Sequence, residues 1–135
     1  MYSKYSIYSD CLLTFMTILN QLKLYHWQTI SYSRHKATDE LYGNLSGLVD
    51  KFIETLHGRI SYDTPNYRIM LSDNNSTIFL KNIKDVKGVD LLKNIKNYLE
   101  GNELKKIIDN NTELQNIRDE MLGAINQTNY LFSLN

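Results

Sequence analysis

The sequence predicts an all-α fold: one domain over residues 1–135, built as a four-helix bundle with one long crossover between its second and third helices. Apolar residues recur at helical spacing over four stretches, and turn-forming residues fill a long interval between the second and the third. A hydrophobic content of 42% in 135 residues suffices for one ordinary core.

The first helix is expected from about Tyr5 to Gln28, because its apolar residues follow the helical period and no Gly or Pro interrupts them. These residues are Ile7, Cys11, Phe15, Ile18, Leu19, Leu22 and Tyr25. Cys11 is the single cysteine of the chain, so we expect a buried thiol and no intrachain disulfide.

The second helix is expected from about Arg34 to Ile60, with Ser31 or Ser33 as its N-cap. Its apolar stripe consists of Ala37, Leu41, Leu45, Leu48, Phe52, Leu56 and Ile60. Gly43 and Gly47 lie one turn apart within it, and each costs about 1 kcal/mol relative to Ala. We expect these two glycines to mark the close approach of a neighbouring helix.

The interval 61–88 contains the turn signals Pro65, Ser72-Asp-Asn-Asn-Ser76 and Gly88. A connection of this length is typical of a segment that crosses the length of a bundle.

The third helix is expected from near Val89, with a continuation past Gly101 to Ile108. Residues 109–112 predict a stop and a new N-cap, after which a final helix runs to the end of the chain. Two long helices, a crossover and two further helices have the connectivity of the ferritin-like fold.

The charge of the chain is balanced, with 15 Lys and Arg residues and 15 Asp and Glu residues. Non-specific nucleic-acid binding requires a cationic excess, so we do not expect DNA binding. The opening MYSKYSIYSD predicts neither a polycationic tail nor a secretory signal, and no apolar run approaches the roughly 20 residues of a transmembrane helix. We therefore expect a cytoplasmic protein with no membrane partner.

Side chains of metal-ligand type are concentrated on the expected second helix: His35, Asp39, Asp50, Glu54 and His57. At about 100° of rotation per residue, all five fall within an arc of roughly 100° beside the apolar stripe. A solvated face more often mixes Lys with Glu and uses little His. The concentration indicates a metal-binding face.

The ligands cannot all bind one ion within a single chain. Fifteen residues separate His35 from Asp50 (50 − 35), or roughly 22 Å along a helix, whereas metal–ligand bonds are about 2.0–2.6 Å long. Either the chain has two separate half-sites, or a second copy lies antiparallel and a two-fold axis joins the His35 end of one copy to the Asp50 end of the other. We predict the second arrangement, a metal site between the subunits of a homo-oligomer.

His26 adds a further candidate ligand at the end of the first helix, nine residues before His35 (35 − 26). Two imidazoles and two carboxylates form a mixed N/O set suited to Fe(II), Mn(II) or Zn(II), and open positions favour redox iron. An intrachain di-iron centre needs two Glu-x-x-His pairs, and the chain has only the one formed by Glu54 and His57. His57 is therefore either an outer ligand or a structural residue.

Three motifs resemble the ferroxidase-site pattern of the Dps miniferritins, and residues 111–134 resemble the last helix of that family: Tyr25-His26-Trp27, His35-Lys-Ala-Thr-Asp39 and Asp50-Lys-Phe-Ile-Glu54. The resemblance implies a di-metal iron site with ligands from two subunits: His26, His35 and Asp39 from one, and Asp50 and Glu54 from its two-fold mate. It places Trp27 beside the iron as the candidate catalytic side chain. It further implies Fe(II) oxidation, with peroxide as the preferred oxidant, in protection against oxidative damage or in iron handling.

The sequence departs from the Dps pattern in the shorter interval between His26 and His35, in a shorter third helix and in the lack of the Lys-rich tail of DNA-binding members. The shortened interval resembles compact Dps-related proteins of viruses and phages, for which the host cytoplasm or the virion is the implied location. A two-fold dimer is the minimum assembly, and a dodecameric cage is the larger alternative that the resemblance offers.

The alternative function belongs to a different class. The chain would then be a non-catalytic ferritin-like scaffold that dimerises or binds another protein, with its carboxylates as relics or as a structural zinc site. In that case Trp27 would be an interface or core aromatic residue rather than a redox participant.

Overall fold

The computed structural model describes residues 4–72 and 76–134, and over these residues it is helical with no β-strand. Its helices are α1 (Lys4–Gln28), α2 (Tyr32–Ser61), α3 (Gly88–Glu100), α4 (Asn102–Ile108) and α5 (Thr112–Phe132), with a short 3-10 turn, η1 (Asp85–Lys87), before α3. The prediction of an all-α chain is confirmed.

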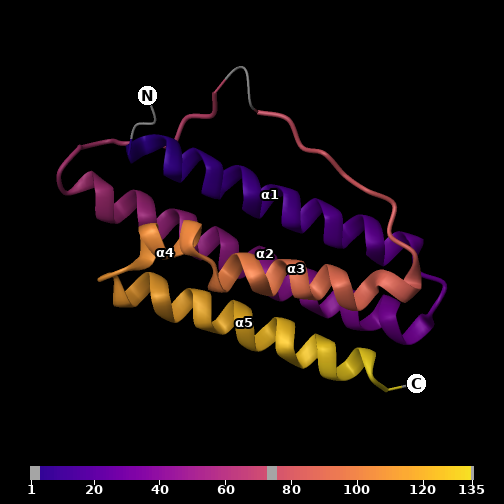
Figure 1. The fold of residues 1–135 in the computed structure, drawn as a ribbon. Helices are drawn as coiled ribbons and strands as arrows, with labels where there is room; N and C mark the ends of the chain where they lie inside the picture. The colour runs from indigo at the N-terminus through magenta and orange to yellow at the C-terminus, as the bar shows by residue number, and fades with distance from the viewer. Residues whose placement is uncertain (1–3, 73–75, 135) are drawn as a thin grey trace.

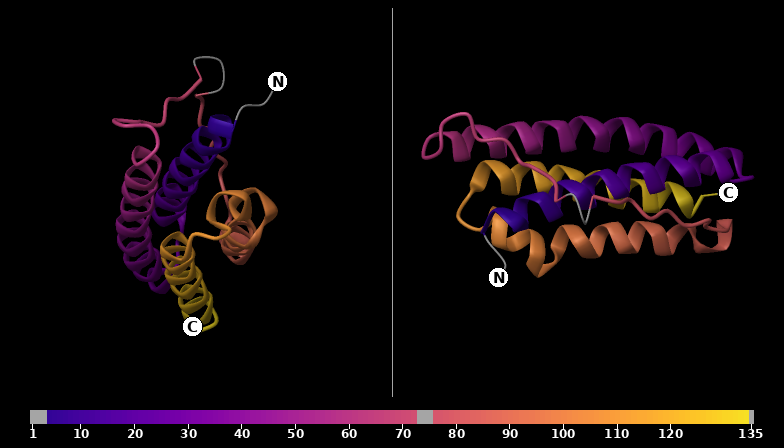
Figure 2. Two further views of the ribbon diagram at one scale, coloured as in Figure 1. Left: turned by 90° about the vertical axis from the view of Figure 1, so that its left-hand side faces the viewer. Right: turned by 90° about the horizontal axis from the view of Figure 1, so that it is seen from above.

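The long helices lie side by side along one axis of the molecule (Figure 1). α2 packs against α1 and α5, while α3 packs against α5 and α1. α4 lies near the start of α1, at the end of the molecule where α5 begins (Figures 1 and 2). The views in Figure 2 show that the helices surround a common interior.

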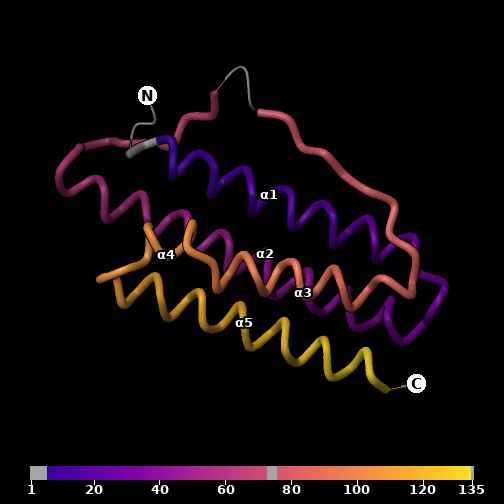
Figure 3. The backbone as a smooth tube through the Cα atoms, viewed as in Figure 1, coloured from indigo at the N-terminus to yellow at the C-terminus, as the bar shows by residue number. Residues whose placement is uncertain are grey.

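A long segment without helix or strand connects α2 to η1 and is described over residues 62–72 and 76–84. It leaves the end of α2 and runs back along α1 to the opposite end of the molecule, so that α2 and α3 run in the same direction (Figures 1 and 3). Residues 73–75 of the predicted turn cluster lie outside the described residues.

Side-chain hydrogen bonds to the backbone hold this segment on α1. The buried Gln21 binds Lys81 in both directions: its Nε2 donates to the Lys81 carbonyl at 2.7 Å, and its Oε1 accepts from the Lys81 N–H at 2.8 Å. Farther along α1, Gln28 Nε2 donates to Asn82 Oδ1 at 2.8 Å. Because both ends of the Gln21 amide are used, this one side chain replaces a pair of backbone hydrogen bonds.

The core takes one face from each long helix, as the apolar spacing predicts. Its aromatic centre joins three helices, since the Phe15 ring lies edge-on to Phe52 at 5.2 Å and to Tyr98 at 5.8 Å between centroids. Cys11, Leu22, Leu41 and Leu56 of the predicted stripes are buried with them.

Local signals explain the start of α2 and the break between α3 and α4. Ser31 caps α2 through its hydroxyl, which accepts from the Arg34 N–H at 3.2 Å, and this confirms one of the two predicted caps. The predicted continuation beyond α3 is interrupted, because Gly101 is extended (φ −82°, ψ 169°) and separates α3 from α4. A Cβ at Gly101 would lie 2.9 Å from the Asn97 carbonyl oxygen, so the break favours glycine. The predicted stop near residue 109 is confirmed, and α5 begins at Thr112.

None of the helices in the described part of the chain combines the length and the apolar character needed to cross a membrane.

Candidate metal centre

His26 and His35 form a stacked pair where α1 and α2 meet. His26 lies in the last turn of α1 and His35 in the first turn of α2, and the short connection between these helices brings the two rings together. Their centroids are 4.0 Å apart with an interplanar angle of 18°. His26 is buried, with 5% of its surface exposed, whereas His35 faces solvent.

Hydrogen bonds assign the tautomer of His26. Its Nδ1 lies 3.0 Å from Thr38 Oγ1, and the Thr38 hydroxyl itself lies 2.8 Å from the Arg34 carbonyl oxygen. A carbonyl can only accept, so the single hydroxyl proton is donated to the backbone and His26 Nδ1 must be the donor to Thr38. This leaves His26 Nε2 with its lone pair free.

The same reasoning applies to His35. Its Nδ1 lies 3.1 Å from the carbonyl oxygen of His26, and this oxygen can only accept. In its neutral form each ring therefore carries its proton on Nδ1 and keeps Nε2 unprotonated, the tautomer that a metal-binding imidazole needs. Burial, followed by the neighbouring His35, holds the pKa of His26 below its usual range, which favours this neutral form.

Asp39 lies one helical turn after His35 on the exposed side of α2. Its charge acts on His26 in the direction that raises the pKa of the imidazole, although burial outweighs it. Within the described residues, no three His, Cys, Asp or Glu side chains come close enough to hold a metal ion. At this end of α2 the described chain brings together only the two imidazoles of His26 and His35.

Asp50 and Glu54 lie farther along α2, one turn apart and both exposed. Neither forms an ion pair with any described residue, so both carboxylates are free to bind a cation. They lie on the same broad face of α2 as His35 and Asp39, but several helical turns farther along the helix axis. The structure therefore brings His26 and His35 together and leaves Asp50 and Glu54 as a separate pair of carboxylates.

Gly43 and Gly47 lie between the two halves on α2. A Cβ added at either position would meet nothing within 4 Å, and both glycines are exposed. The expectation that they mark a close approach is wrong within the described part of this chain, because no neighbouring atom lies near enough to require glycine at either position. The two glycines instead line an open hollow that α2 shares with Glu120, Ala124 and Gln127 of α5.

His57 has a structural role in this chain. Its Nε2 accepts a hydrogen bond from the Ile69 N–H at 3.0 Å and so anchors the start of the long segment after α2. Burial, followed by the charge of Arg68, lowers its pKa, so the ring is neutral at pH 7 and its proton lies on Nδ1. The structure supports the structural interpretation of His57.

Trp27 is exposed to 69% and lies next to His26 on the last turn of α1. The ammonium of Lys23 lies 5.6 Å from the centroid of its ring. Its role beside a bound metal stays a prediction.

Thr38 is a residue of the candidate site that the sequence patterns did not reveal. It is fully buried on α2 and sets the tautomer of His26 from outside the ligand set. Its spacing could have indicated this role, because Thr38 lies three residues after His35 and its hydroxyl meets His26 at the end of α1 when the two helices pair.

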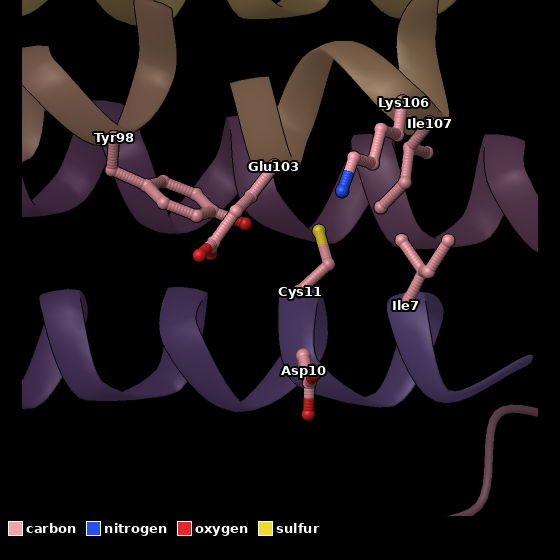
Figure 4. A pocket seen from close by; sticks show the side chains of 7 residues that line it. All are labelled: Ile7, Asp10, Cys11, Tyr98, Glu103, Lys106 and Ile107. Carbon is pink, nitrogen blue, oxygen red and sulfur yellow. The ribbon is translucent and has the colours of Figure 1, made fainter. Parts of the chain in front are cut away.

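A pocket of about 280 Å³ lies between α1 and α4, away from the histidine pair (Figure 4). Cys11 points its sulfur from α1 toward α4, between Glu103 and Lys106, whereas Asp10 points the other way. The thiol is 2% exposed, and burial raises its pKa to about 12. A thiol of this kind is neither a nucleophile nor a metal ligand near pH 7, which confirms the expected core role of Cys11.

Comparison with known proteins gives one match. The model of a family of unknown function, DUF5856, matches residues 26–132. The chain belongs to this family. The matched part begins at His26 and includes both halves of the candidate site. No curated protein and no solved structure matches the chain.

Proposed function

We propose that the chain is a ferritin-like protein resembling Dps, a four-helix bundle with one crossover, which binds Fe(II) between two subunits and oxidises it. Support comes first from the stacked histidine pair, whose hydrogen bonds leave both Nε2 atoms free as ligands. Nitrogen ligands of this kind, combined with carboxylates, suit Fe(II), with Mn(II) and Zn(II) as substitutes.

The observation that carries the intersubunit arrangement is a symmetry in the positions of the ligands. Nineteen residues separate His35 from Glu54 (54 − 35), and eleven separate Asp39 from Asp50 (50 − 39). Both intervals have the same midpoint, between Asn44 and Leu45. A two-fold axis at this midpoint therefore brings an antiparallel second α2 into a register that pairs His35 with Glu54 and Asp39 with Asp50 at both ends.

The surface between the two halves suits this contact. In the same register Tyr42 of one copy meets Gly47 of the other, and Gly43 meets Ser46. The open space at both glycines lets two helices approach closely, with the Tyr42 ring lying over the bare backbone at Gly47. Each complete site then contains His26, His35 and Asp39 from one chain and Asp50 and Glu54 from the other.

The metal would also control the assembly. The register gathers three carboxylates at each site and no Lys or Arg among the ligands, so the metal-free contact is weakened by like-charge repulsion. A divalent cation neutralises this charge and joins the two chains, and binding of the cation stabilises the dimer by mass action.

In the reaction Fe(II) is the substrate. Two Fe(II) ions each give up one electron, and one peroxide molecule accepts both, so that its O–O bond breaks and two protons convert the oxygens to water. The carboxylates would hold the cations and balance the charge of the Fe(III) product. Consumption of Fe(II) together with peroxide would protect against oxidative damage.

Anaerobic titration of Fe(II) into the metal-free protein tests the proposal. We expect saturable binding of about two to four Fe(II) ions per dimer, shared between two equivalent sites, and rapid oxidation on addition of peroxide. Asp50→Ala and Glu54→Ala should each abolish tight binding and leave the helical content unchanged. Glu40→Ala is the matched control, because Glu40 is an exposed acid of α2 outside the ligand arc. Oxidation that persists in both variants would place the site elsewhere.

The second candidate function is a non-catalytic dimeric scaffold, and the observation in its favour is that no three ligand side chains converge within the described residues. Metal analysis of protein purified without chelators separates the two candidates. A scaffold with relic carboxylates would contain no stoichiometric metal, and a structural zinc site would contain zinc that resists replacement by iron.

A further inference from the structure

An open cavity of about 380 Å³ lies beside Glu54, where α2 ends and the long segment toward α3 begins. Its lining consists of Glu54, His57, Gly58, Ser61 and Arg68. A Cβ at Gly58 would meet nothing within 4 Å, so this glycine widens the cavity. The cavity adjoins one half of the candidate metal centre but contains side chains that the proposed function does not use.

Three residues of this lining carry side-chain hydrogen-bond donors: His57, Ser61 and Arg68. His57 Nε2 already accepts from the Ile69 N–H, so the neutral ring presents its Nδ1–H, which has no partner among the described residues. Ser61 contributes a hydroxyl. Arg68 donates one Nη1 hydrogen bond to the Tyr67 carbonyl at 2.7 Å, and its remaining N–H groups stay available.

The charge of Arg68 is not neutralised by a carboxylate. In the part of the chain that the structure describes, the guanidinium forms no ion pair, although Arg59 nearby is paired with Glu113 at 2.7 Å. An unpaired guanidinium with an imidazole N–H and a hydroxyl around one hollow matches the oxygens of an oxyanion.

Glu54 is the one acidic residue of the lining, and its charge opposes an anion. A cation bound at Glu54 would reverse this effect, because it would lie between the carboxylate and the anion. We propose that the cavity binds inorganic phosphate, held by Arg68, His57 and Ser61, next to the cation of the metal centre. The cooperative part of this proposal rests on the proposed function, whereas the donor set of the cavity does not.

The two proposals are tested separately by measuring phosphate binding to metal-free protein by isothermal titration calorimetry. Glu54→Gln removes the opposing charge and keeps the size of the side chain, so it should tighten phosphate binding about tenfold over wild type. Adding Arg68→Gln to this variant should remove the gain. Adding Arg59→Gln instead should retain it, because Arg59 does not line the cavity.

Equal phosphate affinity of wild type and Glu54→Gln, or an equal effect of the two arginine substitutions, would overturn the phosphate site. Neither outcome depends on metal, so the proposed function would be untouched. With Mn(II) as the probe cation, phosphate and Mn(II) should each tighten the binding of the other to wild-type protein by the same factor. If Mn(II) binds and phosphate does not change its affinity, the cooperative part is wrong.

Discussion

The imidazole rings of His26 and His35 stack at 4.0 Å, and each ring has its Nδ1 proton committed to an oxygen atom. One oxygen belongs to Thr38 and the other to the backbone of His26 itself. Burial, followed by the neighbouring His35, lowers the pKa of His26, so the buried imidazole favours its neutral form.

Acidification should therefore destabilise the chain through His26. Its pKa is lowered in the folded state, so its contribution to stability is complete above the ordinary pKa near 6.5 and is lost as the pH falls toward the folded pKa. We expect the urea midpoint of wild type to fall between pH 7.5 and pH 5.5, and His26→Gln to show a smaller fall. Asp85 has a lowered pKa and stays ionised in this range, so it does not contribute. Equal losses in both proteins would contradict the assignment.

Gly47 offers a test of the proposed α2 contact that does not depend on metal chemistry. Gly47→Ala should stabilise the single chain by about 1 kcal/mol, since the Cβ meets open space and Ala favours the helix. Gly47→Leu should also fold, but its side chain would block the approach of a second α2. Sedimentation velocity of wild type should show a dimer when divalent cation is present. The Gly47→Leu variant should remain a monomer with and without the cation.

Gly123→Leu is the matched control for this substitution. Gly123 is an exposed glycine of α5 with open space at its Cβ, and it does not line the hollow that contains Gly47. A dimer that survives Gly47→Leu would rule out the proposed register.

Gln21 is expected to carry the attachment of the long segment to α1. Gln21→Ala leaves the Lys81 N–H and carbonyl without their partner and should lower the free energy of unfolding by about 2 kcal/mol. Gln28→Ala, which removes only the exposed hydrogen bond to Asn82, should change it by less than about 0.5 kcal/mol. Chemical denaturation followed by circular dichroism measures both, and equal effects would show that Gln21 has no special role.

Cys11 should be unreactive in the folded chain. Its thiol is buried with a pKa raised to about 12, so little thiolate exists at pH 8 to attack a disulfide reagent. Reaction with Ellman's reagent should require unfolding and should accelerate in urea in parallel with the unfolding transition. Rapid stoichiometric labelling of the native protein would contradict the buried position of the sulfur.

Much of the fold follows from local sequence, because the apolar period of a helix is a local property. The stripes that include Phe15, Leu41 and Phe52 are buried as predicted, and Ser31 caps α2 as expected. The histidine pair was also predictable, since a short connection between paired helices leaves few places for His26 and His35.

Other features depend on contacts between distant parts of the chain. The amide of Gln21 binds a residue sixty positions away, and no local pattern distinguishes this glutamine from a solvated one. Thr38 likewise acquires its role only when α1 and α2 pair. Gly43 and Gly47 suggested a close helix neighbour, but in the described part of the chain they line an open hollow beside α5, which helix propensity alone does not reveal.

The claim that each site is shared between two subunits is tested most directly by mixing two inactive variants. His35→Ala lacks one half of the site and Glu54→Ala lacks the other, so neither homodimer should oxidise Fe(II) with peroxide. After unfolding and refolding of an equal mixture, activity should return to about a quarter of the wild-type value, because half of the dimers are mixed and each mixed dimer has one complete site of two. If the mixture stays as inactive as either variant alone although mass spectrometry detects mixed dimers, the shared site is contradicted.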